Sequence, residues 1–134
     1  MNMRSLLTVT AIVELASGIA LLAAPSAGAQ LLVGEPLATP ALMVVGRFVG
    51  AALAAIGVIC WRLRHMDHAD SRVGLLLGLL TYNVAAPSIL LEANVLQGVH
   101  GLALWPAVGL HLFLGLWCIA CLRAQPVADG RSAS

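Results

Sequence analysis

The chain has 134 residues, of which 60% are hydrophobic and 10% are charged. A soluble domain is about 45–50% apolar and about a quarter charged, so this composition excludes an ordinary soluble enzyme and a disordered chain. The net charge of +1 provides no basic surface for DNA or RNA, and we expect no nucleic-acid partner. The composition is typical of a polytopic membrane protein whose main partner is the lipid bilayer.

Four segments are long and apolar enough to span a membrane. A spanning helix needs about 20 mostly apolar residues, and such stretches occur at residues 5–24, 41–61, 73–91 and 99–122. Lipid cannot satisfy exposed backbone groups, and four strands cannot close a barrel, so each segment must be a helix. The sequence predicts an all-α fold with one four-helix transmembrane bundle over residues 1–124 and a disordered tail over residues 125–134.

The arginines predict how the bundle is oriented. Those outside the spans gather on one side of the predicted topology: Arg4, Arg62, Arg64, Arg72, Arg123 and Arg131. The two loops on the other side, residues 25–40 and 92–98, contain no arginine or lysine and carry Glu35 and Glu92. The positive-inside rule therefore predicts that both termini are cytoplasmic. We expect a multi-pass protein of a bacterial inner membrane.

The first segment has a second interpretation. Residues 1–4 resemble the n-region of a signal peptide, and Ala27-Gly28-Ala29 resembles its cleavage site. The apolar stretch is longer than the usual h-region of roughly 7–15 residues and contains Glu14, which favours a retained helix. Cleavage would leave three spans with the same orientation.

Prolines and polar residues predict details of the layout. Pro40 is suited to the first turn of the second helix, and Asp70 or Ser71 to capping the third. Pro106 is expected to kink the fourth helix. The mildly apolar loop 25–40 is expected to lie on the membrane surface.

Small residues repeat at four-residue spacing on two helices: Gly46, Gly50 and Ala54 on the second, and Gly74 and Gly78 on the third. Such stripes let helix backbones approach closely in lipid, where water supplies no hydrophobic drive between helices. We expect both stripes to pack inside the bundle. A homodimer face is the alternative.

Five polar residues fall at membrane depth: Glu14, Arg47, Tyr82, Asn83 and His111. A charged side chain at mid-bilayer costs about 2.5–3.5 kcal/mol on insertion scales, so each should face the protein interior or a partner. At a rise of about 1.5 Å per residue all except Arg47 lie at one depth, and Arg47 enters from the outer side and reaches toward Glu14. We expect a buried polar layer that carries protons or holds a small ligand; the alternative is an ion pair that only fixes helix register.

Three cysteines and two histidines lie near the inner end of the bundle: Cys60, Cys118, Cys121, His65 and His68. Two thiolates with two imidazoles would suit zinc or another thiophilic metal, and the C-x-x-C pair alone would suit a redox couple. Cysteine is also a common small apolar residue in buried helices. Because no family-type spacing accompanies these pairs, we expect solvated histidines and no cofactor.

No phosphate-binding glycine loop, nucleophile elbow or zinc-protease motif occurs, and no carboxylate pair has catalytic spacing. We therefore expect a non-enzymatic protein whose polar layer binds a small ligand or stabilises a partner complex. A proton-coupled transporter and a metal-binding or thiol-redox protein are the alternatives.

Several short motifs together resemble a group of small bacterial four-helix membrane proteins: Gly46-Arg47-Phe48-x-Gly50, Cys60-Trp61, Tyr82-Asn83, Trp105-Pro106-Ala107-x-x-x-His111 and Trp117-Cys118. The resemblance extends over about 115 residues and implies the fold without any chemistry, since that group has no assigned function.

The first predicted helix is also similar to that of small multidrug resistance transporters, which have the same size and four helices. The similarity rests on Ala11-Ile12-Val13-Glu14-Leu15-Ala16. It implies a proton-coupled transporter acting as a dimer, with Glu14 as the site for the proton and the substrate cation. Arg47 and His111 depart from that family's pattern, and Arg47 beside Glu14 would neutralise the charge that cation binding needs.

Overall fold

The computed structural model describes residues 2–66 and 68–124. This part of the chain contains five helices and no strand, which confirms the predicted all-α fold. Four of the helices are long and apolar enough to cross a membrane, as predicted. The predicted tail, residues 125–134, lies outside the described residues.

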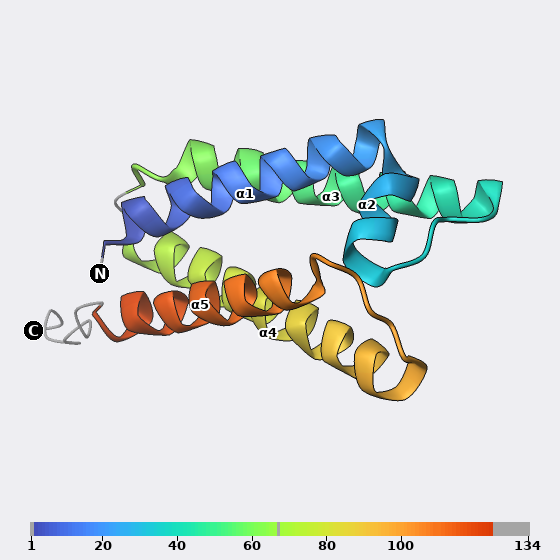
Figure 1. The fold of residues 1–134 in the computed structure, drawn as a ribbon. Helices are drawn as coiled ribbons and strands as arrows, with labels where there is room; N and C mark the ends of the chain where they lie inside the picture. Colours follow the sequence, from blue (N-terminus) through green and yellow to red (C-terminus); the bar gives the residue numbers. More distant parts are fainter. Residues whose placement is uncertain (1, 67, 125–134) are drawn as a thin grey trace, which may run out of the picture.

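The helices follow one another in the order α1 (Met3–Ala23), α2 (Pro25–Val33), α3 (Pro40–Leu63), α4 (Ala69–Gln97) and α5 (Leu104–Arg123). The four predicted spans correspond to α1, α3, α4 and α5 (Figure 1). Helix α4 extends beyond the predicted 73–91 at both ends, and α5 begins five residues later than predicted.

The starts of α3 and α4 confirm the prediction for Pro40 and correct the predicted cap of α4. Pro40 does occupy the first turn of α3, and the Thr39 side chain caps that helix by accepting from the backbone N–H of Leu42. The N-cap position of α4 is His68, which precedes both predicted positions, Asp70 and Ser71; its carbonyl accepts from the backbone N–H of Arg72 at 3.1 Å.

Pro106 does not interrupt α5. The helix begins at Leu104, so Pro106 lies in its first turn, where a missing N–H removes no helical hydrogen bond. The proline inside a described helix is Pro87 of α4.

The predicted loop 25–40 contains a short helix, α2, that connects the two halves of the bundle. Pro25 begins α2, and Gly34 ends it in the left-handed conformation at φ 86°. The backbone N–H of Ala103, just before α5, donates to the carbonyl of Leu31 at 2.8 Å. A Cβ on Gly101 would lie 2.1 Å from the Leu32 carbonyl oxygen, so only glycine fits this crossing.

Helices α1 and α3 pack backbone to backbone. A Cβ on Gly50 would lie 2.8 Å from the Leu22 nitrogen and 2.9 Å from the Gly18 oxygen, and a Cβ on Gly57 would meet Leu15. The predicted stripe on α3 therefore packs inside the bundle. The stripe on α4 does not, because nothing lies within 4 Å of a Cβ built on Gly74 or Gly78.

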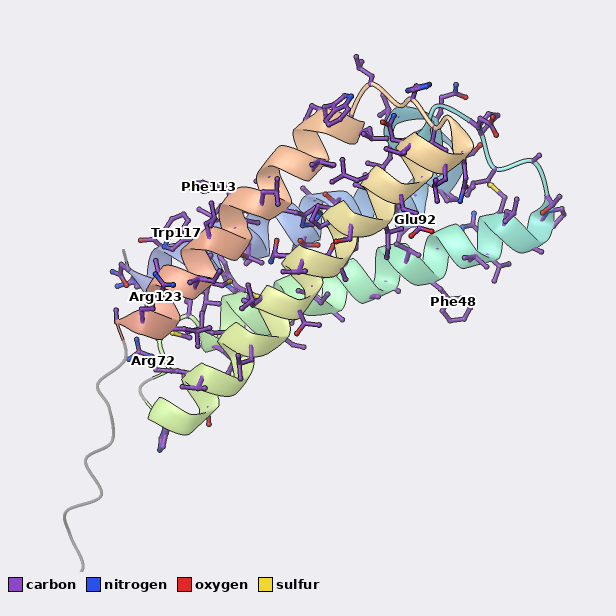
Figure 2. The ribbon with its side chains drawn as sticks, turned by 90° about the horizontal axis from the view of Figure 1, so that it is seen from below. Phe48, Arg72, Glu92, Phe113, Trp117 and Arg123 are labelled. Atoms are coloured by element: carbon purple, nitrogen blue, oxygen red, sulfur yellow. The ribbon has the colours of Figure 1, made fainter. Side chains whose placement is uncertain are left out.

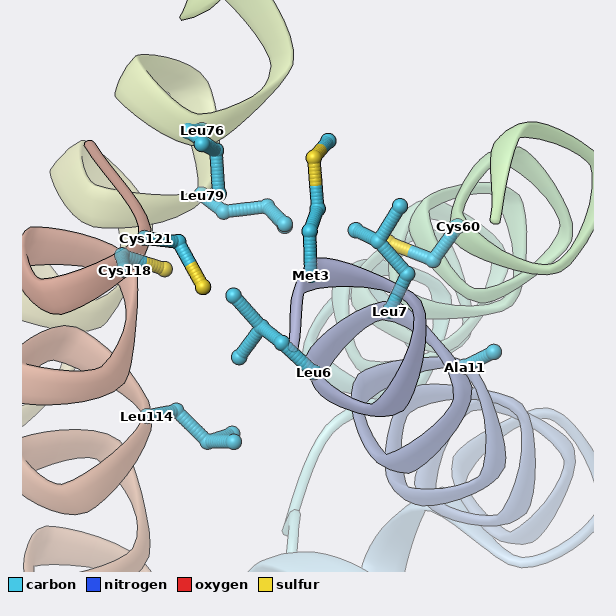
Figure 3. Packing of buried hydrophobic residues seen from close by; sticks show 10 residues of the cluster. All are labelled: Met3, Leu6, Leu7, Ala11, Cys60, Leu76, Leu79, Leu114, Cys118 and Cys121. Atoms are coloured by element: carbon cyan, nitrogen blue, oxygen red, sulfur yellow. The ribbon is translucent and has the colours of Figure 1, made fainter. Parts of the chain in front are cut away.

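The bundle consists of two helix pairs, α1 with α3 and α4 with α5 (Figure 1). They share an apolar cluster at the end of the bundle that holds Met3, Leu63 and Arg123, called the basic end below. Figure 3 shows this cluster, which takes side chains from all four long helices: Met3, Leu6, Leu7, Ala11, Cys60, Leu76, Leu79, Leu114, Cys118 and Cys121. Leu6 points toward α5 and Leu7 toward Cys60 of α3.

Gly50→Ala should destabilise the protein, because its Cβ would collide with the α1 backbone and overpacking costs about 1–3 kcal/mol. The matched substitution Gly78→Ala should be neutral or stabilise by up to about 1 kcal/mol, since it meets open space and alanine favours a helix. Thermal unfolding in detergent, followed by circular dichroism, measures both. Equal midpoints for the two variants would contradict the described packing of α1 on α3.

Candidate functional site

Glu14 is buried inside the bundle at 2% exposure. It follows Leu7 by two helical turns and therefore continues the buried face of α1 away from the basic end. The Tyr82 hydroxyl of α4 donates to Glu14 Oε2 at 3.4 Å. This hydrogen bond links one helix pair to the other across the interior.

Asn83 and His111 join α4 to α5 beside that carboxylate. The Asn83 amide nitrogen donates to the Leu79 carbonyl at 2.8 Å, which directs its side-chain oxygen to His111 Nδ1 at 3.0 Å. Because an amide oxygen only accepts, Nδ1 of His111 must carry the proton. In the neutral form of this ring, Nε2 keeps a lone pair that accepts from a further donor.

Tyr82 also contacts the imidazole directly. The two rings meet edge to face, with centroids 5.2 Å apart and an interplanar angle of 88°. Side chains from three helices thus form one connected group, which we call the polar layer: Glu14, Tyr82, Asn83 and His111. The sequence prediction that these four residues lie at one depth agrees with their contacts.

Arg47 does not belong to the polar layer, and the predicted reach toward Glu14 is wrong. Its side chain is exposed, and no ion pair joins these two described residues. The register of α1 on α3 explains the separation. Gly57 packs against Leu15, so Glu14 lies level with that part of α3, and Arg47 lies ten residues, or ~15 Å, farther along the helix.

The cysteines and histidines do not assemble into a metal centre in the described ranges. Cys60, Cys118 and Cys121 are all buried in the apolar cluster (Figure 3), whereas His65 and His68 are exposed in the α3–α4 connection. No group of three or more His, Cys, Asp or Glu side chains within 2–66 and 68–124 is placed to hold a metal ion. The described part of the chain therefore does not support the metal alternative.

The sequence prediction missed Thr10. This residue is 1% exposed, and its hydroxyl has no hydrogen-bond partner among the described residues. It precedes Glu14 by four residues and so shares its face of α1. An unsatisfied buried hydroxyl costs about 1–3 kcal/mol, which a polar ligand or water would recover. The sequence did contain a signal for Thr10, because it lies four residues before Glu14, a carboxylate already expected to be buried.

Asn83→Leu should destabilise the protein by about 0.6 kcal/mol and at most about 1.7 kcal/mol, the average and the maximum for interhelical hydrogen bonds in a membrane protein. The variant removes the acceptor of His111 and leaves the half-buried Nδ1–H without this partner. Ser88→Ala is the control on the same helix, because the exposed Ser88 hydroxyl bonds only the Val84 carbonyl of its own helix. Unfolding midpoints in detergent compare the two, and equal shifts would exclude a bond between helices at Asn83.

Comparison of the chain with protein-family models, with curated proteins and with solved structures found no match. The resemblances drawn from its short motifs therefore remain predictions.

Proposed function

We propose that the chain is a small, non-enzymatic, multi-pass protein of a bacterial inner membrane that binds a small ligand at its polar layer. The described part begins and ends at the basic end (Figure 1). Arg123 lies there (Figure 2), and so do Arg4, near the start of α1, and Arg62, near the end of α3. The positive-inside rule supports a cytoplasmic location for this end and for both termini.

The observation that carries the proposal is the incomplete solvation of the Glu14 carboxylate. A carboxylate accepts about four hydrogen bonds, yet Tyr82 is the donor that the structure gives Glu14, and its hydroxyl is 3.4 Å away. An isolated ionised carboxylate is very unfavourable in hydrocarbon. A bound cation or hydrogen-bond donor would complete this environment.

The aromatic neighbours of Glu14 favour a cationic ligand. Tyr82 donates to the carboxylate and meets the His111 ring edge to face, so aromatic carbon and a negative charge occur in one connected group. A cation over an aromatic face gains about 0.5–2 kcal/mol, most where water is excluded. We infer that the ligand is a lipophilic amine or ammonium ion.

The arrangement of the helix pairs supports entry from the bilayer. In the described residues no Cα atom of α3 lies within 8 Å of a Cα atom of α4, although these helices are consecutive in the chain. A ligand moving from lipid to Glu14 between them would displace side chains and would not have to separate packed backbones.

A proton-coupled transporter acting as a dimer is the second candidate, and the position of Arg47 favours it. Arg47 is exposed, and no arginine within residues 2–66 and 68–124 forms an ion pair with the Glu14 carboxylate. Glu14 is then able to exchange a proton for a cation, which is the chemistry that such transport requires.

Binding is tested by proton release from the purified protein in weakly buffered detergent, on addition of lipophilic ammonium cations and matched lipophilic anions. The cations should release protons from wild type and from Glu92→Gln, a control that removes an exposed carboxylate of α4. Glu14→Gln should abolish the release, because the glutamine side chain has no acidic proton to release.

Two outcomes would contradict the proposal. One is release that persists in Glu14→Gln. The other is silence across the panel together with a lower unfolding midpoint for Glu14→Gln, which would make the carboxylate structural. If the cations do release protons from Glu14, a second measurement distinguishes a transporter from a binding protein. A transporter should accumulate the cation in proteoliposomes when protons flow outward down their gradient, and a binding protein should not.

A further inference from the structure

A second polar site lies at the basic end, apart from the polar layer. A cavity of about 540 Å³ opens there between the start of α1, the end of α3 and the start of α4. Seven of the residues that line it are polar or polarisable: Asn2, Met3, Arg4, Arg64, His65, Met66 and Arg72. The buried cluster around Leu6 and Leu7 separates this cavity from Glu14.

The cavity carries positive charge from three separate segments. Arg4 comes from α1, Arg64 follows α3 and Arg72 comes from α4, and no acidic side chain is among the described lining residues. The first turn of α1 contains no acidic residue either, so the positive end of its helix dipole adds to the field.

Neutral groups hold two of these arginines in place. The Arg64 guanidinium lies 3.7 Å from the centroid of the Trp61 ring and donates to the Trp61 carbonyl. The Nε–H of Arg72 donates to the Met3 sulfur at 3.1 Å. A ring, a carbonyl and a thioether position a guanidinium without cancelling its charge. A guanidinium has five N–H donors, and these contacts with described residues use one on each arginine.

We propose that this cavity binds a phosphate-bearing anion. Guanidinium groups match phosphate oxygens with paired hydrogen bonds, and the cavity has the size of a small-ligand site, about 300–1,000 Å³. It lies at the ends of three candidate membrane spans, and the ends of spanning helices meet the headgroup region of a bilayer. The phosphate therefore belongs either to an anionic phospholipid or to a soluble phosphate compound.

The test uses the full chain and two probes. Native mass spectrometry counts the lipids retained after release from nanodiscs of phosphatidylglycerol or of phosphatidylcholine. Titration with inorganic phosphate in detergent follows the fluorescence of Trp61, which lies against Arg64. Arg72→Gln and Arg64→Gln remove lining charges, and Arg62→Gln removes the same charge from an exposed neighbour outside the cavity.

We expect wild type and Arg62→Gln to bind one of the two probes, with affinity falling about fivefold for each lining arginine that is removed. Retention of phosphatidylglycerol assigns the phosphate to a lipid, and a response to inorganic phosphate alone assigns it to a soluble anion. Loss of binding in Arg62→Gln equal to that in Arg72→Gln would overturn the proposal, because general surface charge would then explain it. Failure of both probes to bind folded wild type would also overturn it.

Discussion

The rest of the structure depends on the backbone contact between α1 and α3. In lipid, apolar side chains gain little by leaving their surroundings, so helices associate where small residues let their backbones approach. Gly18, Gly50 and Gly57 supply that approach here. The contact fixes both the rotation and the register of α1. Rotation turns Glu14 toward α4, and register separates it from Arg47.

Much of the fold was predictable because the bilayer imposes simple rules on a sequence. Hydropathy and length identified the four spans. Equal depth along the helices grouped four residues that are in contact in the structure: Glu14, Tyr82, Asn83 and His111. Depth depends mainly on the distance from a helix end, which the sequence gives within a turn. The predicted polar layer therefore agrees with the contacts of these four residues.

The failed predictions concern relations between helices. The position of Arg47 was wrongly predicted because α1 ends at Ala23 while α3 begins at Pro40, farther out and beside α2. The end of α1 and the beginning of α3 therefore do not lie at one level. The stripe at Gly74 and Gly78 resembles the stripe on α3, and spacing alone does not reveal which stripe has a partner. The predicted start of α4 was wrong because the helix extends into a polar segment whose residues were expected to form the loop.

The two proposed sites divide the length of α1 between them. Met3 and Arg4 line the basic cavity, Leu6 to Ala11 build the apolar cluster, and Glu14 reaches the polar layer. In each site, neutral or aromatic groups contact the charged side chains and hold them in place without neutralising their charge. The cluster of packed leucines and cysteines keeps the positive cavity and the buried carboxylate from pairing with each other.

The central claim is that Glu14 is a carboxyl group that a lipophilic ligand reaches from the bilayer. Reaction with a lipophilic carbodiimide, which adds to a protonated carboxyl in apolar surroundings, tests it most directly when the modified residue is mapped by mass spectrometry. Our account predicts labelling at Glu14 that a lipophilic ammonium cation prevents and a matched anion does not. An unlabelled Glu14 in folded protein, or labelling that the cation leaves unchanged, would contradict it.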